Sequence, residues 1–491
     1  MLPKSVAFVL RLTLLSALLI PIAPAAPGQP PLEQADIPAF PGAEGFGRYA
    51  QGGRGGDVYY VENLNDSGPG SLRHGIETAD GPRTIMFNVS GNIPLESPLE
   101  IDKPYITIAG QTAPGDGVTL RDDQLTVSND HIIIRFIRSR MGDRRGHARS
   151  PIRVQAGRNI ILDHVSSSWG INETLSTSSP AYDSVQASEP GDIDLITIQW
   201  CIVSEGLYDS HAFNEKTERA YGGVIRGRRE SLHHNLYAHN NWRSPKIAWR
   251  SHSQVDFRNN VIFNAASRAN HDGSNDYVNW VDNYYKPGPN TGAPDPYIIY
   301  EIWNHSPMEG QKEVTPQFYV AGNYVEGHPE VTADNWAGVG FSREAGPESL
   351  IEEPHDYPAI SYARTAQEAY EIVLAKAGAS FARDAIDRRI VEEARHGTAT
   401  YGGVKGEGSG IIDSQDDVGG WPELRSAEPP VDSDGDGLPD WWKIEHGLDP
   451  NDAAEGNRDR NGDGYTNLEE YLDWLVNPRG RFLDKHPNFM Y

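Results

Sequence analysis

The sequence predicts an all-β protein, a β-solenoid whose short strands stack in successive coils. Glycine and proline are abundant, with 50 and 35 residues in a chain of 491, which favours a turn-rich fold over a helical one. From residue 39 to residue 335 the chain consists of short apolar runs separated by Gly, Asn, Asp and Ser. At this length we expect two or three domains and a large core.

A loose template recurs along this region: two or three alternating apolar residues, a polar residue that is often asparagine, and another apolar residue. The residues taken as equivalent are His164, Cys201, Asn235, Asn260, Asn283 and Asn323, with spacings of 37, 34, 25, 23 and 40 residues. Stacked coils bury apolar faces that one coil cannot bury alone, and stacked asparagines satisfy backbone groups at a coil corner. A β-sandwich would show strands every 8–12 residues or so, and the longer spacings favour the solenoid. Cys201 is then a small buried residue.

Beyond the solenoid the pattern becomes helical. Thr365 and Glu368 form a capping box before an apolar run, and a second helical run ends at Gly397. We expect these helices to pack on the solenoid or to cap one of its ends. The predicted segments are a signal peptide (1–25), the β-helix (39–335), a helical extension (336–425), a linker (426–431), a calcium-binding segment (432–475) and a C-terminal tail (476–491).

The first 25 residues predict secretion. Lys4 and Arg11 flank the start of an apolar run that is too short to span a membrane, and Ala23-Pro24-Ala25 offers a cleavage site. Since Cys201 is the single cysteine, no intramolecular disulfide can form. We therefore expect an extracellular monomer that is stabilised by packing or bound ions.

The charge balance limits the partners. A formal net charge of −26 argues against nucleic acid and anionic membranes. An acidic polysaccharide can still bind if its groove is locally basic or bridged by a metal ion. A candidate basic patch, whose arginines could instead pair with carboxylates, consists of Arg135, Arg138, Arg140, Arg144 and Arg145.

Two loops near the C-terminus fit calcium binding. The second loop matches the EF-hand pattern at each position, from Asp459 through the glycine turn to a bidentate Glu470. The first loop has the same spacing, but its twelfth residue is Lys443. The predicted ligands are Asp432, Asp434, Asp436 and Asp440 in the first loop and Asp459, Asn461, Asp463, Tyr465, Asn467 and Glu470 in the second. We expect a structural role for this EF-hand-like segment, with the docking of a partner as the alternative.

Five motifs in order give the chain a resemblance to a known family. They are AFPGAEGFG (39–47), NLNDSGPGSLR (63–73), ITIAGQTAPGDG (106–117), DHVSSSW (163–169) and HHNLYAHNNWRSP (233–245). Together they resemble secreted pectate lyases, polysaccharide lyase family 1 and its close relatives. The resemblance implies a right-handed parallel β-helix that cleaves α-1,4-linked polygalacturonate by β-elimination with Ca²⁺.

The resemblance also assigns site residues. Asp163 and Glu173 match the family's calcium-binding aspartate and glutamate. A further family ligand is Thr177 here, so calcium would depend more on substrate oxygens. Arg243 matches the arginine that removes the C5 proton of the uronate. Calcium on the uronate carboxylate would lower the cost of the charge that develops there.

The second arginine of the family's R-x-P-x-x-R motif is absent, because Ala248 stands in its place. Either Lys246 or Arg250 could supply this second cation. Lys216 falls where relatives carry a substrate-binding lysine. These cations would bind uronate carboxylates and stabilise the developing charge.

Two rival functions stay open at this point. A glycoside hydrolase on the same fold needs two carboxylic groups at a set separation and no metal, and no Asp-Asp pair lies near Arg243. A non-catalytic, calcium-dependent carbohydrate-binding or adhesion protein would explain the missing second arginine. The histidines that suggest zinc have no spacing typical of a zinc site. They are His211, His233, His234 and His239.

Overall fold

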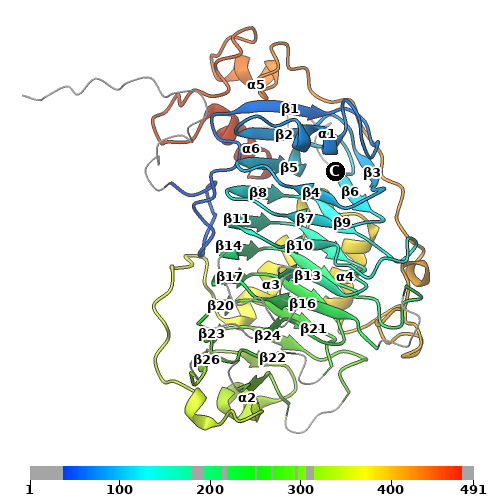
Figure 1. Ribbon diagram of the computed structural model, residues 1–491, viewed down its shortest axis with the longest axis vertical. Coiled ribbons are helices and arrows are strands. Elements are labelled where there is room, and N and C mark those ends of the chain that lie inside the picture. Colours follow the sequence, from blue (N-terminus) through cyan, green and yellow to red (C-terminus); the bar gives the residue numbers. More distant parts are fainter. Residues whose placement is uncertain are drawn as a thin grey trace, which may run out of the picture. The chain divides into compact units, whose positions relative to one another are not determined.

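Each coil of the protein contributes strands to three parallel sheets, which run along the whole solenoid (Figure 1). The computed structural model describes residues 37–178, 193–212, 218–248, 252–266, 270–292, 297–305 and 314–477. The predicted signal peptide, the tail from residue 478 on, and the candidate residues Lys216 and Arg250 lie outside the described residues.

Sheet A has ten strands and sheets B and C have nine each, and every strand pairs in parallel with the strands of the neighbouring coils. Sheet A is β1(Asp57–Val61), β2(Arg83–Phe87), β5(Ile106–Ala109), β8(Ile132–Arg135), β11(Gly157–Asp163), β14(Ile193–Gln199), β17(Arg229–His233), β20(Gln254–Arg258), β23(Tyr277–Val281) and β26(Gln317–Ala321). Sheet B is β3(Gly91–Pro94), β6(Val118–Arg121), β9(Arg138–Arg140), β12(Ser166–Ser168), β15(Ile202–Ser204), β18(Leu236–Ala238), β21(Val261–Phe263), β24(Tyr284–Lys286) and β27(Tyr324–Val325). Sheet C is β4(Leu99–Ile101), β7(Leu125–Val127), β10(Ile152–Val154), β13(Glu173–Thr177), β16(Tyr221–Ile225), β19(Lys246–Ile247), β22(His271–Asp272), β25(Tyr300–Trp303) and β28(Val339–Ser342).

This arrangement confirms the predicted all-β fold, a right-handed parallel β-helix. One face of each sheet is apolar and faces the inside of the coils, where residues such as Ile160, Ile196 and Val255 are completely buried. Alternate residues point outward, because successive side chains of a strand lie on opposite faces. The outward-facing side chains of each sheet therefore determine what the sheet binds and which other segments pack on it.

The predicted asparagine column at the corner between sheets A and B is confirmed. Asn235 Oδ1 accepts the amide proton of Cys201 at 2.8 Å, and Asn260 Oδ1 in turn accepts that of Asn235 at 2.9 Å. The same contacts continue to Asn283 and Asn323. The residue predicted to begin this column, His164, was wrong by one position. Asp163 is in register with Gln199, so His164 is level with Trp200 and the column continues from Cys201 to Val165.

The predicted helical extension packs on sheet B (Figure 1). It contains α3(Ala366–Lys376) and α4(Ala385–His396), and their apolar residues contact the outer side chains of β15, β18 and β21. The capping box at Thr365 is confirmed, and Gly397 ends α4 with a φ of +69°. Between helix and sheet, Arg138 and Arg140 are buried against Asp384. Most of the candidate basic patch is therefore structural.

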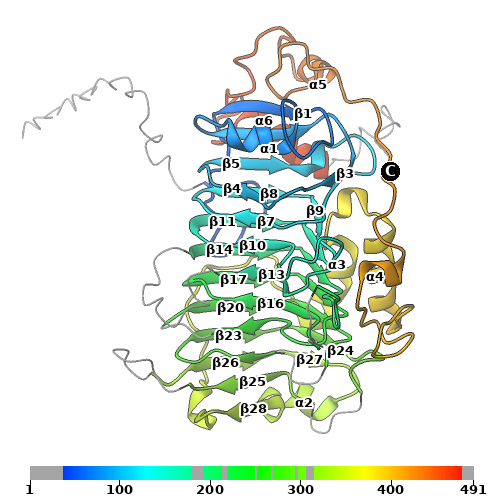
Figure 2. The same ribbon diagram turned by 45° about the vertical axis from the view of Figure 1, so that its right-hand side comes forward.

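The C-terminal segment packs on the outer face of sheet A near β1 (Figure 2). Its helices are α5(Asp440–Glu445) and α6(Asn467–Val476), and α1(Leu72–Glu77) and α2(Pro329–Ala333) complete the α-helices of the described chain. Trp442 and Leu468 contact Met86 of β2 and Ala109 of β5 in one apolar cluster, and Arg54 pairs with Glu469 at 2.7 Å. Within the part of the chain that the structure describes, none of the helices has the length and apolar character needed to cross a membrane.

Candidate active site

Arg243 lies on the outer side of sheet C and contacts the carboxylate of Glu173. Glu173 begins β13 and is in register with Tyr221 of β16, and Tyr221 is bridged to Trp242, the residue before Arg243. The guanidinium also lies over the ring of Tyr221, 3.8 Å from its centroid. The Arg243 side chain is 25% exposed and that of Glu173 is 10% exposed, so substrate can reach the pair.

A close approach of backbones places Arg243 here. A Cβ atom on Gly222 would lie 2.6 Å from the carbonyl oxygen of Arg243, and the amide of Gly223 donates to that same oxygen. Only glycine allows β16 to come this near. The glycine pair after Tyr221 therefore holds the Arg243 loop against the coil that carries Glu173.

Lys246 adds a second cation at this site. It begins β19, three residues after Arg243, and its ammonium lies 3.1 Å from the carboxylate of Asp272. Burial lowers the pKa of Lys246, Asp272 raises it, and the charges of Arg243 and Arg226 lower it further. The described residues thus bring the two predicted cations together on one face of a protein whose net charge is −26.

Asp163 does not share this site, which corrects the predicted pairing of Asp163 and Glu173 around one calcium ion. Asp163 ends β11 in sheet A, whereas Glu173 begins β13 in sheet C, and a complete strand of sheet B lies between them in the chain. The Asp163 carboxylate is fully buried and contacts Arg135 at 2.8 Å and Gln199 at 2.7 Å. It lines a cavity of about 690 Å³ on its own side of the solenoid, together with His164 and Trp200.

Thr177, the residue at the position of the further family ligand, is turned away from solvent. Its hydroxyl donates to the buried carboxylate of Glu230 at 3.0 Å. Asn172, next to Glu173, offers an amide oxygen, which here accepts a hydrogen bond from Arg219. Among the described residues of this site, Glu173 and Asp272 offer carboxylates and Asn172 offers an amide oxygen, and Asp272 and Asn172 are already bonded to Lys246 and Arg219. Calcium takes six to eight oxygens as a rule, so protein ligands alone do not complete a site here.

The four histidines have structural partners. His211 pairs with Asp143 at 2.9 Å, and His239 pairs with Glu393 at 2.9 Å. His233 and His234 are buried side by side, and the ring of His234 stacks on Trp200. Within the described chain, the one group of three or more acidic, histidine or cysteine side chains close enough to share a metal ion contains none of them.

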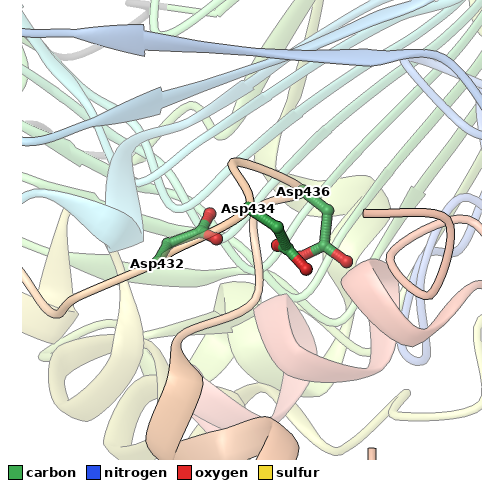
Figure 3. A group of neighbouring side chains, drawn as sticks. All are labelled: Asp432, Asp434 and Asp436. Atoms are coloured by element: carbon green, nitrogen blue, oxygen red, sulfur yellow. The ribbon is translucent and has the colours of Figure 1, made fainter. Parts of the chain in front are cut away.

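That group consists of Asp432, Asp434 and Asp436 in the first C-terminal loop (Figure 3). Its geometry is dominated by Lys443, which replaces the glutamate of the EF-hand pattern. The Lys443 ammonium is fully buried and lies 2.5 Å from Asp434 and 2.8 Å from Asp436. Asp440 is turned toward Ser433. A protein cation thus already neutralises two of the predicted ligands.

Three of the predicted ligands in the second loop, Asp459, Asn461 and Asp463, are exposed. Asp459 accepts the amide protons of Gly462 and Gly464, which is the turn expected of an EF-hand loop. Asn461 contacts both Asp463 and Glu470. Arg460 lies 2.9 Å from Glu470 and is the nearest cation to these ligands that is described. Asn467 is buried and starts α6.

Several residues of the Arg243 site were missed in the sequence. Tyr221, Arg219 and Asp272 lie outside the five family motifs. The stacking of coils brings Tyr221 against Arg243, Arg219 over the ring of Tyr221, and Asp272 against Lys246. The Gly222-Gly223 pair was the one available signal, since two adjacent glycines inside a strand indicate a close backbone approach.

Comparisons with known proteins identify the family to which the chain belongs. No protein-family model matches the chain. It is 37% identical over 445 residues to the probable pectate lyase C of Aspergillus terreus, covering 89% of this chain and 94% of that protein. It is 36% identical over 444 residues to the probable pectate lyase C of Emericella nidulans, covering 90% and 93%.

Among solved structures, the cedar pollen allergen jun a 1 covers 68% of this chain and 92% of its own, with 18% identity and a TM-score of 0.48. The assignment depends on the sequence relatives, because their identity extends over nearly the full length of both proteins. This chain is therefore an enzyme that belongs to the pectate lyase family.

Proposed function

We propose that this enzyme is a secreted, calcium-dependent lyase that cleaves α-1,4-linked polygalacturonate by β-elimination on the outer face of sheet C. The observation that carries the proposal is the contact of Arg243 with Glu173, with Lys246 beside it. The names of the relatives, which are probable pectate lyases, support the substrate class.

The reaction requires a base and a route for the leaving group. The C5–H bond and the C4–O bond break, a C4=C5 double bond forms, the base takes the C5 proton, and the leaving oxygen gains a proton. Arg243 is the base in this proposal. A guanidinium keeps its proton at ordinary pH, and a neighbouring carboxylate favours that charged form. Arg243 therefore has to leave Glu173 and give one proton to solvent before its neutral guanidine can take the C5 proton.

Glu173 provides that release. It is the described carboxylate beside Arg243 that would hold calcium, and binding a cation would take its charge away from the guanidinium. When bound, calcium would neutralise the uronate carboxylate and make the C5 proton more acidic. Asn172 and the substrate's own oxygens would complete the ligand set. Lys246 binds the uronate carboxylate and keeps it next to Arg243.

An assay on polygalacturonate tests this function. We expect an unsaturated, ultraviolet-absorbing product that forms with calcium and disappears with a chelator. Arg243→Ala should abolish the product while its circular dichroism spectrum stays that of the parent. Arg229→Ala is the matched control, because Arg229 also pairs with a carboxylate, Asp194, but on sheet A. Reducing ends without the unsaturated product would show that the enzyme is a hydrolase. If neither product forms, the protein binds the polysaccharide without cleaving it.

Secretion has a separate test. The predicted signal peptide would be removed during export, so the N-terminus of protein recovered from the culture medium should begin near residue 26. Protein that keeps Met1, or that stays in the cells, would contradict the extracellular part of the proposal.

We further propose that the C-terminal segment binds calcium, tightly in the second loop and weakly in the first. In the first loop a calcium ion would have to displace the buried Lys443 ammonium from Asp434 and Asp436. In the second loop the twelfth position is a carboxylate, Glu470, and the cation beside it is the part-exposed Arg460, which calcium can displace more easily than a buried ammonium. Calorimetric titration of the full chain tests this order. Glu470→Gln should remove the tight site, and Lys443→Glu should add a second one. Retention of the tight site in Glu470→Gln would contradict it.

A further inference from the structure

A second basic and aromatic group lies on the same face of sheet C, beyond Lys246. Lys246 of β19 is in register with His271 of β22, and His271 is in register with Glu301 of β25. Glu301 is followed two residues later by Trp303, and β28 continues the sheet to Ser342. The group therefore begins on the strand next to Lys246 and continues over the two strands beyond it.

Trp303 is the centre of the group. Its ring lies 4.6 Å from the ring of His271, 5.3 Å from the Lys246 ammonium and 4.7 Å from the Arg343 guanidinium. Its indole nitrogen donates to Glu301 at 3.1 Å, which fixes the orientation of the ring. The ring thus connects Lys246 at the proposed cleavage site with Arg343, which lies further along the sheet.

Arg343 is exposed and stacked on Trp303, and no carboxylate pairs with it among the described residues. The two other cations of this face differ, because Arg243 pairs with Glu173 and Lys246 pairs with Asp272. A guanidinium that is held by an aromatic ring and lacks an anion is well suited to bind a planar carboxylate in bidentate fashion.

The backbone at Arg343 supports a positioned side chain. Arg343 and Glu344 have φ values of +52° and +69°, in the left-handed region that residues other than glycine seldom adopt. The amide of Asn304 donates to the carbonyl oxygen of Arg343 at 3.1 Å, which ties this turn to the end of β25. Strained backbone of this kind is often kept where a side chain has a function.

We propose that Arg343, held on Trp303, binds the carboxylate of a uronate in the same polymer chain, one or more sugar residues away from the cleavage point. This inference deepens the proposed function and rests on it. It makes the carboxylate recognised at Arg343 a determinant of substrate length, since a short oligomer that fills the Arg243 site does not extend to Arg343. Binding energy from such a remote contact helps to hold the reacting sugar in place.

Kinetics on substrates of two lengths test the proposal. Arg343→Ala should raise KM for hexagalacturonate about 5- to 20-fold. The fold-increase in KM for trigalacturonate should be at least five times smaller. Arg388→Ala, which removes an exposed arginine of α4 instead, is the matched control for net charge. Equal effects of Arg343→Ala on both substrates, or no effect on either, would overturn the proposal.

A binding measurement separates this inference from the proposed function. Calorimetry with hexagalacturonate on the Arg243→Ala protein needs no turnover, and adding Arg343→Ala should weaken binding about 5- to 20-fold. If the parent enzyme forms no unsaturated product, the proposed function fails. If it forms product but the double variant binds hexagalacturonate as tightly as the single variant, the role of Arg343 alone is refuted.

Discussion

Two of the protein's arginine–carboxylate pairs, Arg243–Glu173 and Arg135–Asp163, differ in exposure and surroundings. Arg243 and Glu173 meet on sheet C with 25% and 10% of their side chains exposed. Arg135 and Asp163 meet on sheet A with 6% and 0% exposed. The buried pair is held further by Gln199 and by the ring of Phe40, 3.6 Å from the Arg135 guanidinium. Beside the open pair, the Arg243 guanidinium lies 3.8 Å from the centroid of the Tyr221 ring.

The difference shows what burial does to the same chemical pair. A buried pair must keep both partners, because an unpaired charge in the interior costs several kcal/mol. An open pair contributes about 1 kcal/mol or less to stability and can exchange partners with a ligand. We therefore propose a structural role for the pair on sheet A and a chemical role for the pair on sheet C, although the cavity of about 690 Å³ lies beside the former.

Arginine-to-lysine exchange at both positions should separate the two roles most strongly. Arg243→Lys should lower kcat about 10²- to 10⁴-fold, the usual contribution of a positioned base, and should leave the melting temperature unchanged. Arg135→Lys should lower the melting temperature and leave kcat unchanged, because a lysine cannot reproduce the planar guanidinium that faces Asp163. Initial rates and thermal melts of both variants provide the measurement. A large loss of kcat in Arg135→Lys would break the comparison.

Asp163→Asn should lower the free energy of unfolding by about 3–5 kcal/mol, because it leaves the buried Arg135 charge without its anion. Burial alone would raise the pKa of Asp163, but His164, Arg135 and Gln199 together hold it well below its ordinary value. Its contribution is therefore complete above the unfolded pKa of about 3.9 and is lost as the pH falls. Urea unfolding at pH 7 and pH 3 measures this loss. The free energies of unfolding of Asp163→Asn and the parent should differ less at pH 3 than at pH 7.

Glu230, on β17 of sheet A and hydrogen-bonded to Thr177, should titrate in the opposite sense. Burial raises its pKa to about 8 from an ordinary value of 4.5. Between these values the folded protein keeps a proton that the unfolded chain has lost, so stability falls as the pH rises, by at most about 1.4 kcal/mol per pH unit. Glu230→Gln should flatten the stability profile between pH 4.5 and pH 8. An unchanged slope in urea unfolding would refute the raised pKa.

The sequence predicted the solenoid and part of the site for physical reasons that can be named. The asparagine column was visible because each coil corner repeats the same backbone need, and Arg243 was visible because a local motif surrounds it. The error at Asp163 arose because closeness in the chain does not tell which of three sheets a strand joins. The sequence shows that the first loop has Lys443 where the EF-hand pattern has a carboxylate. It does not show that the lysine ammonium is buried against Asp434, because this contact depends on how the loop folds. Arg343 had no signal, since it lies far along the chain from every site motif.

Glu173→Gln should have the smallest effect on folding and still affect catalysis. Loss of this partly open pair should change the free energy of unfolding by less than about 1 kcal/mol. The calcium concentration for half-maximal activity should rise several-fold, because a neutral amide is a weaker ligand than a carboxylate. Activity measured against free calcium, together with urea unfolding, tests both expectations. A destabilisation as large as that of Asp163→Asn would mean that the pair on sheet C is structural as well, and that exposure does not separate the two pairs.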